Sequence, residues 1–345
     1  MRRVLGSLLT AALLLAESAE ACAGCSNPNL PVGRGAGTSV RPGEVSATLN
    51  LTTTAINVVH SEQCPDIGPI CREREEPPQL HDQMFYVAEL RPIVEVGLTE
   101  RFGLEAQLPL RFTRTTVVFR RLDRTAFTPD YENIHHRNET LLGLGDPWVS
   151  GRGAWKLGGV ALVGRLGVSL PLGRTEPNPF ELAERGLAHQ HIQFGTGTFS
   201  PVLSVEAGGM LGGFRLQGSG QTQLFLYPNG DGYQAGNRFT LGVSVERTVV
   251  ERLRVSLGAD VLNEQPERWN GEVQQDGNVG RTDVLAGATL AYPFGSLAVA
   301  LSVKVPVYQH FIQAAHSHGG DPGQLRYPAL INLMVHRSFD LSGPR

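Results

Sequence analysis

Apolar and polar residues alternate along most of the chain. Between residues 84 and 99, one set of alternate positions is largely apolar and the other carries Glu89, Arg91 and Glu95. Successive side chains of a β-strand point to opposite faces, so this period of two predicts a strand with one apolar and one polar face. Beyond the first 21 residues, no stretch has the period of an amphipathic helix.

The same alternation predicts about twelve strands. Their approximate ranges are 43–54, 84–99, 103–119, 143–156, 159–171, 197–208, 211–221, 237–248, 251–263, 280–292, 295–306 and 325–340. Short turns are expected at 100–102, 157–158, 209–210, 249–250 and 293–294, and long polar connections at 55–83, 120–142, 172–196, 222–236, 264–279 and 307–324. An even strand number with short turns on one side and long loops on the other is typical of an all-β, transmembrane antiparallel β-barrel.

A soluble β-sandwich has the same alternation, and the position of the aromatic residues separates the two folds. On the apolar face, one aromatic set falls at the short-turn end: Phe102, Trp155, Phe214, Tyr292 and Phe339. A second set falls at the long-loop end: Tyr86, Phe199, Phe239 and Tyr327. Two girdles suit the two interfaces of a bilayer, whereas a sandwich core would hold aromatics in mid-strand. The pattern favours one barrel over residues 43–341, with a tail at 342–345.

The first residues predict export. Residues 1–21 combine a basic start, an apolar run and a small-x-small site at Ala19–Ala21, as signal peptides do. The apolar run is shorter than the roughly 20 residues that cross a bilayer. Export of a barrel predicts the bacterial outer membrane, with membrane lipid and the barrel-assembly machinery as partners. Residues 22–42 are expected in the periplasm, and a net charge of −3 without a basic run argues against nucleic acid.

The four cysteines form two local pairs. Cys64 and Cys71 are expected to form a disulfide within the first long loop, because envelope compartments are oxidising. Cys22 and Cys25 form a C-x-x-C motif expected at the periplasmic mouth. Three roles stay open for this motif: a disulfide, lipid attachment, or a thiolate site for a soft metal such as Cu(I).

The polar faces of the strands are predicted to line the lumen. Their charged members are Glu89, Arg91, Glu95, Glu105, Arg111, Arg152, Arg165, Glu206, Arg215, Arg238, Glu246, Arg254, Asp260, Asp283 and Lys304. They either border a water-filled passage or pair across the lumen and nearly plug it. The similar numbers of both signs argue against strong selection between anions and cations.

Nine of the ten histidines fall in or beside the long loops, and the i, i+2 spacing of two pairs places both rings on one side of an extended segment. Imidazole binds copper, zinc and nickel, so these residues form a candidate metal-binding rim. Its members are His135, His136, His189, His191, His316 and His318. The alternative is that polar residues simply gather in loops. No resident cofactor is predicted beyond copper or zinc at these histidines.

Catalytic groups have only weak support. His310 with Asp321, or His135 with Asp130, could be assembled near the strand ends, but no nucleophile motif lies beside them. The sequence therefore predicts no enzyme.

Three segments resemble a known family. They are "GLGDPWVSGRGAWKL" at 143–157, "LGVSLPLGRTE" at 166–176 and "RYPALINLMVHRSFDL" at 326–341. They resemble the outer-membrane proteins described as "putative MetA-pathway of phenol degradation", in which a Gly-Leu-Gly-Asp strand start precedes a strand ending in Leu-Pro-x-Gly. The resemblance implies an outer-membrane barrel of transporter type, supplies no catalytic residues and leaves the substrate open. The tail at 342–345 departs from the usual ending, so Phe339 would act as the terminal aromatic from an internal position.

These observations predict a channel that passes a small solute or ion through a mixed-charge lumen by facilitated diffusion. Two alternatives are a surface component that binds or takes up metal through the loop histidines, and a structural barrel with a plugged lumen.

Overall fold

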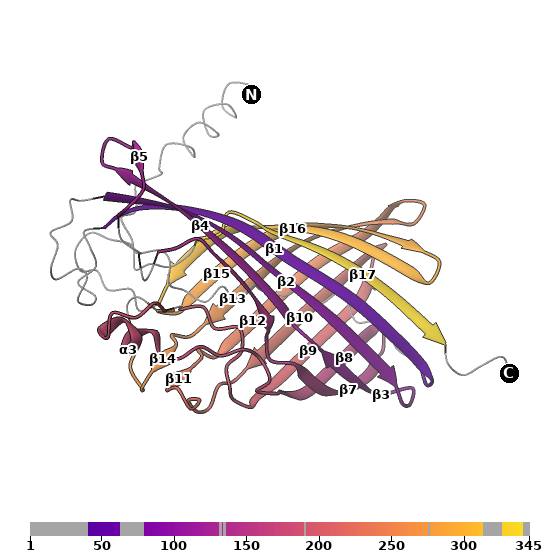
Figure 1. Cartoon of the computed structure of the whole chain (residues 1–345). Coiled ribbons are helices and arrows are strands. Elements are labelled where there is room, and N and C mark those ends of the chain that lie inside the picture. Colours follow the sequence, from indigo (N-terminus) through magenta and orange to yellow (C-terminus); the bar gives the residue numbers. More distant parts are fainter. Residues whose placement is uncertain are drawn as a thin grey trace, which may run out of the picture.

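The chain forms a closed antiparallel β-barrel of twelve strands, which confirms the predicted fold class (Figure 1). The computed structural model describes residues 41–62, 79–130, 133, 136–189, 191–274, 277–312 and 326–340. The expected signal peptide, Cys22, Cys25, Cys64 and Cys71 lie outside these residues. Within them, no helix is long and apolar enough to cross a membrane.

Ten barrel strands are continuous and two consist of two segments each. In chain order they are β1 (Glu44–Glu62), β2 (Gln79–Gly97), β3 (Phe102–Gln107) with β4 (Leu110–Arg121), β6 (Glu139–Leu144) with β7 (Trp148–Leu157), β8 (Val160–Ser169), β9 (Ser200–Leu211), β10 (Phe214–Gln223), β12 (Arg238–Val250), β13 (Leu253–Glu264), β15 (Arg281–Phe294), β16 (Leu297–Phe311) and β17 (Leu330–Asp340). Strand β1 pairs with both β2 and β17, which closes the sheet. Closure leaves no edge, as a strand structure within a bilayer requires.

The two divided strands are interrupted next to each other. Leu108 and Pro109 separate β3 from β4, and residues 145–147 separate β6 from β7. Proline has no N–H to donate to a ladder, so continuous pairing fails there. The backbone amide of Gly145 donates to the carbonyl of Pro109 at 2.8 Å, which carries the contact across both interruptions.

The outer surface of the barrel is apolar. Leu104, Leu166, Leu241 and Leu257 are each more than half exposed. A belt of this kind on every side of the molecule is stable against lipid and would favour aggregation in water. The barrel is therefore a transmembrane protein of the outer-membrane type.

The aromatic residues at both ends follow the prediction with one exception. Phe102 and Trp155 are exposed at the short-turn end, and Tyr86 and Phe199 at the other. Tyr327 was predicted on the lipid face, and this is wrong, because its side chain is 5 % exposed and packs inside the barrel. Tyr327 precedes the first residue of β17, so the strand alternation does not apply to it.

The predicted strand ends needed correction. Residues 55–62 and 79–83 belong to β1 and β2 rather than to a loop, and His60 and His81 are paired positions of the two strands. The β9–β10 turn lies at Gly212 and Gly213, where φ is positive at both residues, rather than at residues 209 and 210. The inward and outward faces were predicted from the aliphatic residues, so these shifts leave them unchanged.

The long connections form a layer at the end opposite the short turns (Figure 1). It contains a short helix, α3 (Pro179–Glu184), which the sequence analysis missed, and the two-residue strands β11 (Tyr233–Gln234) and β14 (Arg268–Trp269), which pair. Asn178 caps α3, since its Oδ1 accepts from the amide of Phe180 at 3.1 Å. A third short strand, β5 (Ala126–Phe127), pairs with β4.

An apolar cluster holds this layer together. Phe225, Tyr233 and Trp269 are almost completely buried and pack with Phe180 of α3. Beneath them, the carboxyl of Glu267 accepts from the indole Nε1 of Trp269 at 3.3 Å and from the amide of Asn278 at 3.1 Å. Burial raises the pKa of Glu267 to about 7.

Candidate functional site

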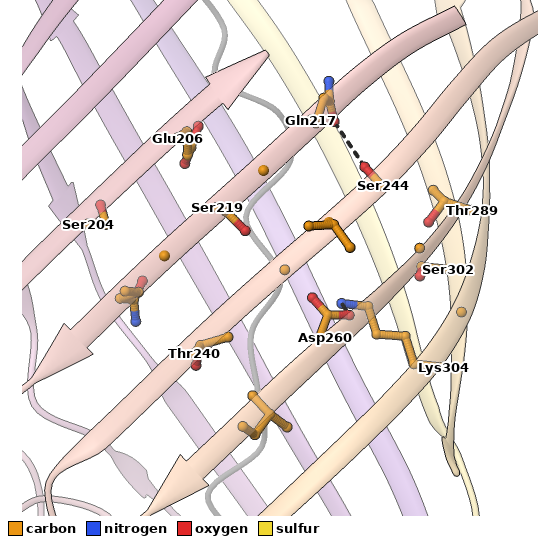
Figure 2. A pocket seen from close by; sticks show the side chains of 18 of the residues that line it. Ser204, Glu206, Gln217, Ser219, Thr240, Ser244, Asp260, Thr289, Ser302 and Lys304 are labelled. Carbon is orange, nitrogen blue, oxygen red and sulfur yellow. Dashed lines mark hydrogen bonds and ion pairs between the residues drawn. The ribbon is translucent and has the colours of Figure 1, made fainter.

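The inward faces of the strands enclose a cavity of about 580 Å³ (Figure 2). Of the charged residues predicted to line the lumen, ten border this cavity: Arg91, Arg111, Glu206, Arg215, Arg238, Glu246, Arg254, Asp260, Asp283 and Lys304. The other five are buried in the barrel interior: Glu89, Glu95, Glu105, Arg152 and Arg165. The predicted set is therefore divided between a hollow part of the lumen and a filled part.

An ion-pair network fills one side of the lumen. The guanidinium of Arg165 reaches Glu105 at 2.7 Å, Glu206 at 2.9 Å and Glu95 at 3.6 Å. Arg152 pairs with Glu95 at 2.9 Å. These residues come from β2, β3, β7, β8 and β9, which are neighbours in the sheet. Desolvated charges are tolerated only when they are paired, and this network pairs all five.

A second ion-pair group continues the filled side. Glu89 lies between two arginines, with its Oε1 2.6 Å from Arg91 Nη2 and its Oε2 2.9 Å from Arg111 Nε. The guanidinium of Arg91 lies 4.9 Å from the centre of the Trp148 ring, a cation–π contact. Arg111 also donates to the carbonyl of Phe194 at 2.8 Å. These contacts connect the barrel wall to a loop inside the lumen.

The opposite side of the lumen carries small residues. The positions of β10, β12, β13, β15 and β16 that border the cavity include Ser219, Thr240, Gly242, Ser244, Ser256, Gly258, Gly287, Thr289, Ala300 and Ser302. Figure 2 shows Ser219, Ser244 and Thr289 along this wall, together with the ion pair of Asp260 and Lys304, whose charged atoms are 2.7 Å apart. Side chains this short leave open space in a barrel of twelve strands.

The connection between β8 and β9 folds into the barrel. Ile192 and Phe194 pack on Leu141 of β6 to form a small buried apolar cluster. Phe194 and Thr196 border the cavity. This loop narrows the lumen from the long-loop end.

Asp146 fixes this loop. Its Oδ2 accepts from the amide and the hydroxyl of Thr196 at 2.7 and 2.6 Å, and its Oδ1 accepts from the amide of Gly173 at 2.9 Å. Gly173 and Gly195 lie backbone to backbone, and a Cβ on Gly195 would stand 2.6 Å from the Cα of Gly173. Only glycine fits such an approach. The Gly-Leu-Gly-Asp and Leu-Pro-Leu-Gly motifs are therefore the residues that anchor the loop.

Sequence reasoning missed two kinds of lumen residue. Lys156 lies on the inward face of β7 and borders the cavity, but it stood at the predicted end of its strand. The period of two already indicated its direction, since it is four residues after Arg152. Phe194 and Thr196 belong to a predicted loop, and no pattern in the sequence indicates that this loop folds inward.

Three of the predicted metal ligands lie beside another histidine: His189 and His191 beside each other, and His136 beside His81, which was not among the predicted ligands. The rings of His189 and His191 are 5.1 Å apart, and those of His81 and His136 are 4.5 Å apart. All four side chains are buried, and His191 packs on Phe180. His135, His316 and His318 lie outside the described residues. Among the residues that the structure describes, no group of three or more His, Cys, Asp and Glu is arranged to hold a metal.

The fold and the polar interior define the class of protein: an outer-membrane β-barrel with a channel-like lumen. Residues 72–310 match the family model described as "Putative MetA-pathway of phenol degradation", and the chain belongs to this family. No curated protein matches the chain.

The chain is similar to several solved structures, and one with a TM-score above 0.5 supports the fold. An outer membrane channel from Pseudomonas putida F1 superposes with a TM-score of 0.58 at 12 % identity, over 90 % of this chain and 100 % of that chain. A FadL homologue from Pseudomonas aeruginosa has a TM-score of 0.37 at 12 % identity, over 94 % and 98 %. The β domain of the Bordetella autotransporter BrkA has a TM-score of 0.40 at 13 % identity, over 86 % and 100 %.

Proposed function

We propose that the protein is a narrow outer-membrane channel that passes small polar solutes or ions by facilitated diffusion. The observation that carries the proposal is the division of the lumen into two sides. The ion-paired network occupies one side, and a cavity of about 580 Å³ lies along the small-residue wall of the other. A barrel that served only as a structural element would gain by filling this wall with large side chains.

The chemistry of the open side suits passage rather than tight binding. Hydroxyl groups such as those of Ser219, Ser244 and Thr289 can replace water around a passing solute. Conduction requires sites that are weak enough for the solute to leave, and single hydroxyl contacts meet this requirement.

The loop anchored by Asp146 supplies the filter. Phe194 and Thr196 narrow the lumen on the long-loop side. The Asp146 carboxylate holds the backbone at Thr196, and Arg111 donates to the carbonyl of Phe194. The fixed loop then sets the largest solute that can pass. An enzyme is not proposed: the contact of the Thr48 hydroxyl with His336 Nδ1 at 2.9 Å, beside the cavity, joins two neighbouring strands of the wall.

The experiment that tests the proposal is single-channel recording of the refolded protein in a planar bilayer, with heat modifiability on a gel to establish folding. Discrete conductance steps support the channel. A folded barrel without steps would favour the plugged structural barrel instead.

Metal binding remains a second proposal, which rests on the ring distances of the two histidine pairs. Two imidazoles at this spacing can bind one Cu(II), Zn(II) or Ni(II) ion together with water. His81, His136, His189 and His191 do not border the cavity, so such a site would lie beside the passage rather than in it.

A further inference from the structure

The two partners of several ion pairs that border the cavity differ in their exposure to it. Three arginine–carboxylate pairs border the cavity: Arg111 with Glu89 near mid-strand, and Arg238 with Glu264 and Arg281 with Asp283 toward the long-loop end. In each pair the arginine side chain is more exposed than the acidic side chain, at 15 % against 3 %, 21 % against 9 % and 16 % against 2 %. A solute in the cavity therefore contacts the arginine of each pair more readily than the carboxylate.

The pair near the short turns has the same order. Arg254 and Glu246 are 3.6 Å apart, and their side chains are 36 % and 16 % exposed. Arg254 lies on β13 and Glu246 on β12, so this pair belongs to the small-residue wall. The Asp260–Lys304 pair is balanced, at 20 % and 22 %.

Two further cations border the cavity near the short turns. Lys156 on β7 and Arg215 on β10 are both exposed to the lumen. Within the described residues, neither forms an ion pair. In total, eight lysines and arginines border the cavity against six aspartates and glutamates.

The carboxylate of Asp146 is one of the six, and it is already used by the loop. Glu206 is another, and it is paired with Arg165. The excess of positive charge thus lies on the side chains that a solute can reach.

Two arginines of the lumen wall lie on opposite sides of the cavity. Arg91 on β2 and Arg238 on β12 come from strands that are six apart in the ring of twelve, on opposite sides of the barrel. Both border the cavity, and their charges repel each other across it. An anion between them would relieve that repulsion, whereas a cation would add to it.

We propose that the channel prefers anions, and that its natural solutes are small molecules bearing a carboxylate, phosphate or similar oxyanion. This inference rests on the proposed channel function and names the solute class. Guanidinium groups match such anions in charge and geometry, and arginines spread along the lumen provide successive weak sites. The near balance of signs in the sequence conceals this preference, because selectivity depends on the charges that face the passage.

The test is the reversal potential of the channel in a gradient of KCl. The wild-type protein should show a reversal potential of the sign that marks greater permeability to chloride than to potassium. The double variant Lys156→Gln/Arg215→Gln should shift the reversal potential toward zero. The double variant Lys156→Glu/Arg215→Glu should shift it further, toward the value that marks greater permeability to potassium. Arg114→Gln is the matched control, because Arg114 is exposed on β4 and does not border the cavity.

A second variant separates the effect of side-chain exposure in the ion pairs from the effect of the net charge of the lumen. Exchanging the partners in Arg238→Glu/Glu264→Arg leaves the total charge unchanged and places the carboxylate at the more exposed position. The reversal potential should again shift toward the value that marks greater permeability to potassium. An unchanged value would show that unequal exposure has no role.

The possible outcomes separate a failure of the proposed anion preference from a failure of the proposed channel function. Discrete conductance steps with equal or greater permeability to potassium would overturn the anion preference and leave the channel standing. An anion preference that survives both Lys156/Arg215 variants and the exchange would overturn its assignment to these residues. A folded barrel without any steps would contradict the channel, and the anion preference with it.

Discussion

Asp146 and Thr196 are fifty residues apart in the chain and are joined by two short hydrogen bonds, from the amide of Thr196 at 2.7 Å and from its hydroxyl at 2.6 Å. Both end on the same carboxylate oxygen. The contact joins the interruption of a barrel strand to the loop inside the lumen. It explains why an acidic residue stands in an otherwise apolar stretch of the sequence.

Replacing this carboxylate should release the loop. In Asp146→Ala, the amides of Gly173 and Thr196 lose their acceptor, and hydrogen bonds to a charged group contribute about 1.5–3 kcal/mol each. We expect a larger mean conductance and more frequent current fluctuations in single-channel records. Asp123→Ala is the control, since Asp123 is exposed and bonds only within its own turn. Identical records for Asp146→Ala and wild type would show that the loop is held by other contacts.

The ion-pair network should be sensitive to loss of its central residue. Arg165 contacts three carboxylates, so Arg165→Leu leaves negative charges buried without their partner. Breaking a buried pair in this way costs about 3–5 kcal/mol. The expected result is a marked fall in the urea concentration at which the barrel unfolds. Arg114→Leu, at an exposed position of β4, is the matched control. Equal midpoints for the two variants would mean that the network adds nothing to stability.

The loop layer should be more stable in acid than in base. The pKa of Glu267 is raised by burial from 4.5 to about 7 in the folded layer. The opened layer therefore releases this proton at lower pH than the folded one, and the contribution of Glu267 to stability is complete below pH 4.5 and lost as the pH rises to about 7. The difference amounts to about 3 kcal/mol at most, from 1.36 kcal/mol per unit of pKa.

Amide exchange at residues 267–274 measures this effect, after correction for the intrinsic pH dependence of exchange. Protection should fall between pH 4.5 and 7 in the wild type and should be independent of pH over that range in Glu267→Gln. The same decline in the variant would assign the effect to other groups, such as Glu264, whose charge also acts on Glu267.

Metal binding is predicted at the histidine pairs. Isothermal titration with Zn(II) should give binding to the wild type that weakens in His81→Gln/His136→Gln or in His189→Gln/His191→Gln. His310→Gln serves as control, because its ring stacks on Tyr308 rather than on another histidine. Binding that is the same in all three variants, or absent from the wild type, would remove this second proposal.

The sequence predicted the barrel well because the period of two carries the inward and outward direction of each strand side chain. Residues such as Arg215 and Asp260 could be assigned to the lumen from their neighbours alone. The same pattern does not predict which of these residues form ion pairs with one another. The contacts of Arg165 with Glu95 and Glu206 depend on the register of strands that lie far apart in the chain.

The loops were less predictable for a physical reason. Tyr327 has the composition of a girdle residue, but its hydroxyl donates to Asp283 at 2.6 Å inside the barrel. Phe194 enters the lumen because Gly173 and Gly195 allow two backbones to touch. Both placements follow from tertiary contacts that leave no period in the sequence. Gly173 and Asp146 belong to motifs that the sequence showed, but it did not show that Gly195 and Thr196 are their partners.

Two substitutions at adjacent positions of one strand test whether solutes pass along the small-residue wall. Ser244 borders the cavity, and Val245 is 43 % exposed on the outer face of the same strand. Single-channel conductance should fall strongly in Ser244→Trp, because the indole occupies the passage, and should be unchanged in Val245→Trp. Equal conductance in both variants, in barrels shown to be folded, would contradict passage along this wall.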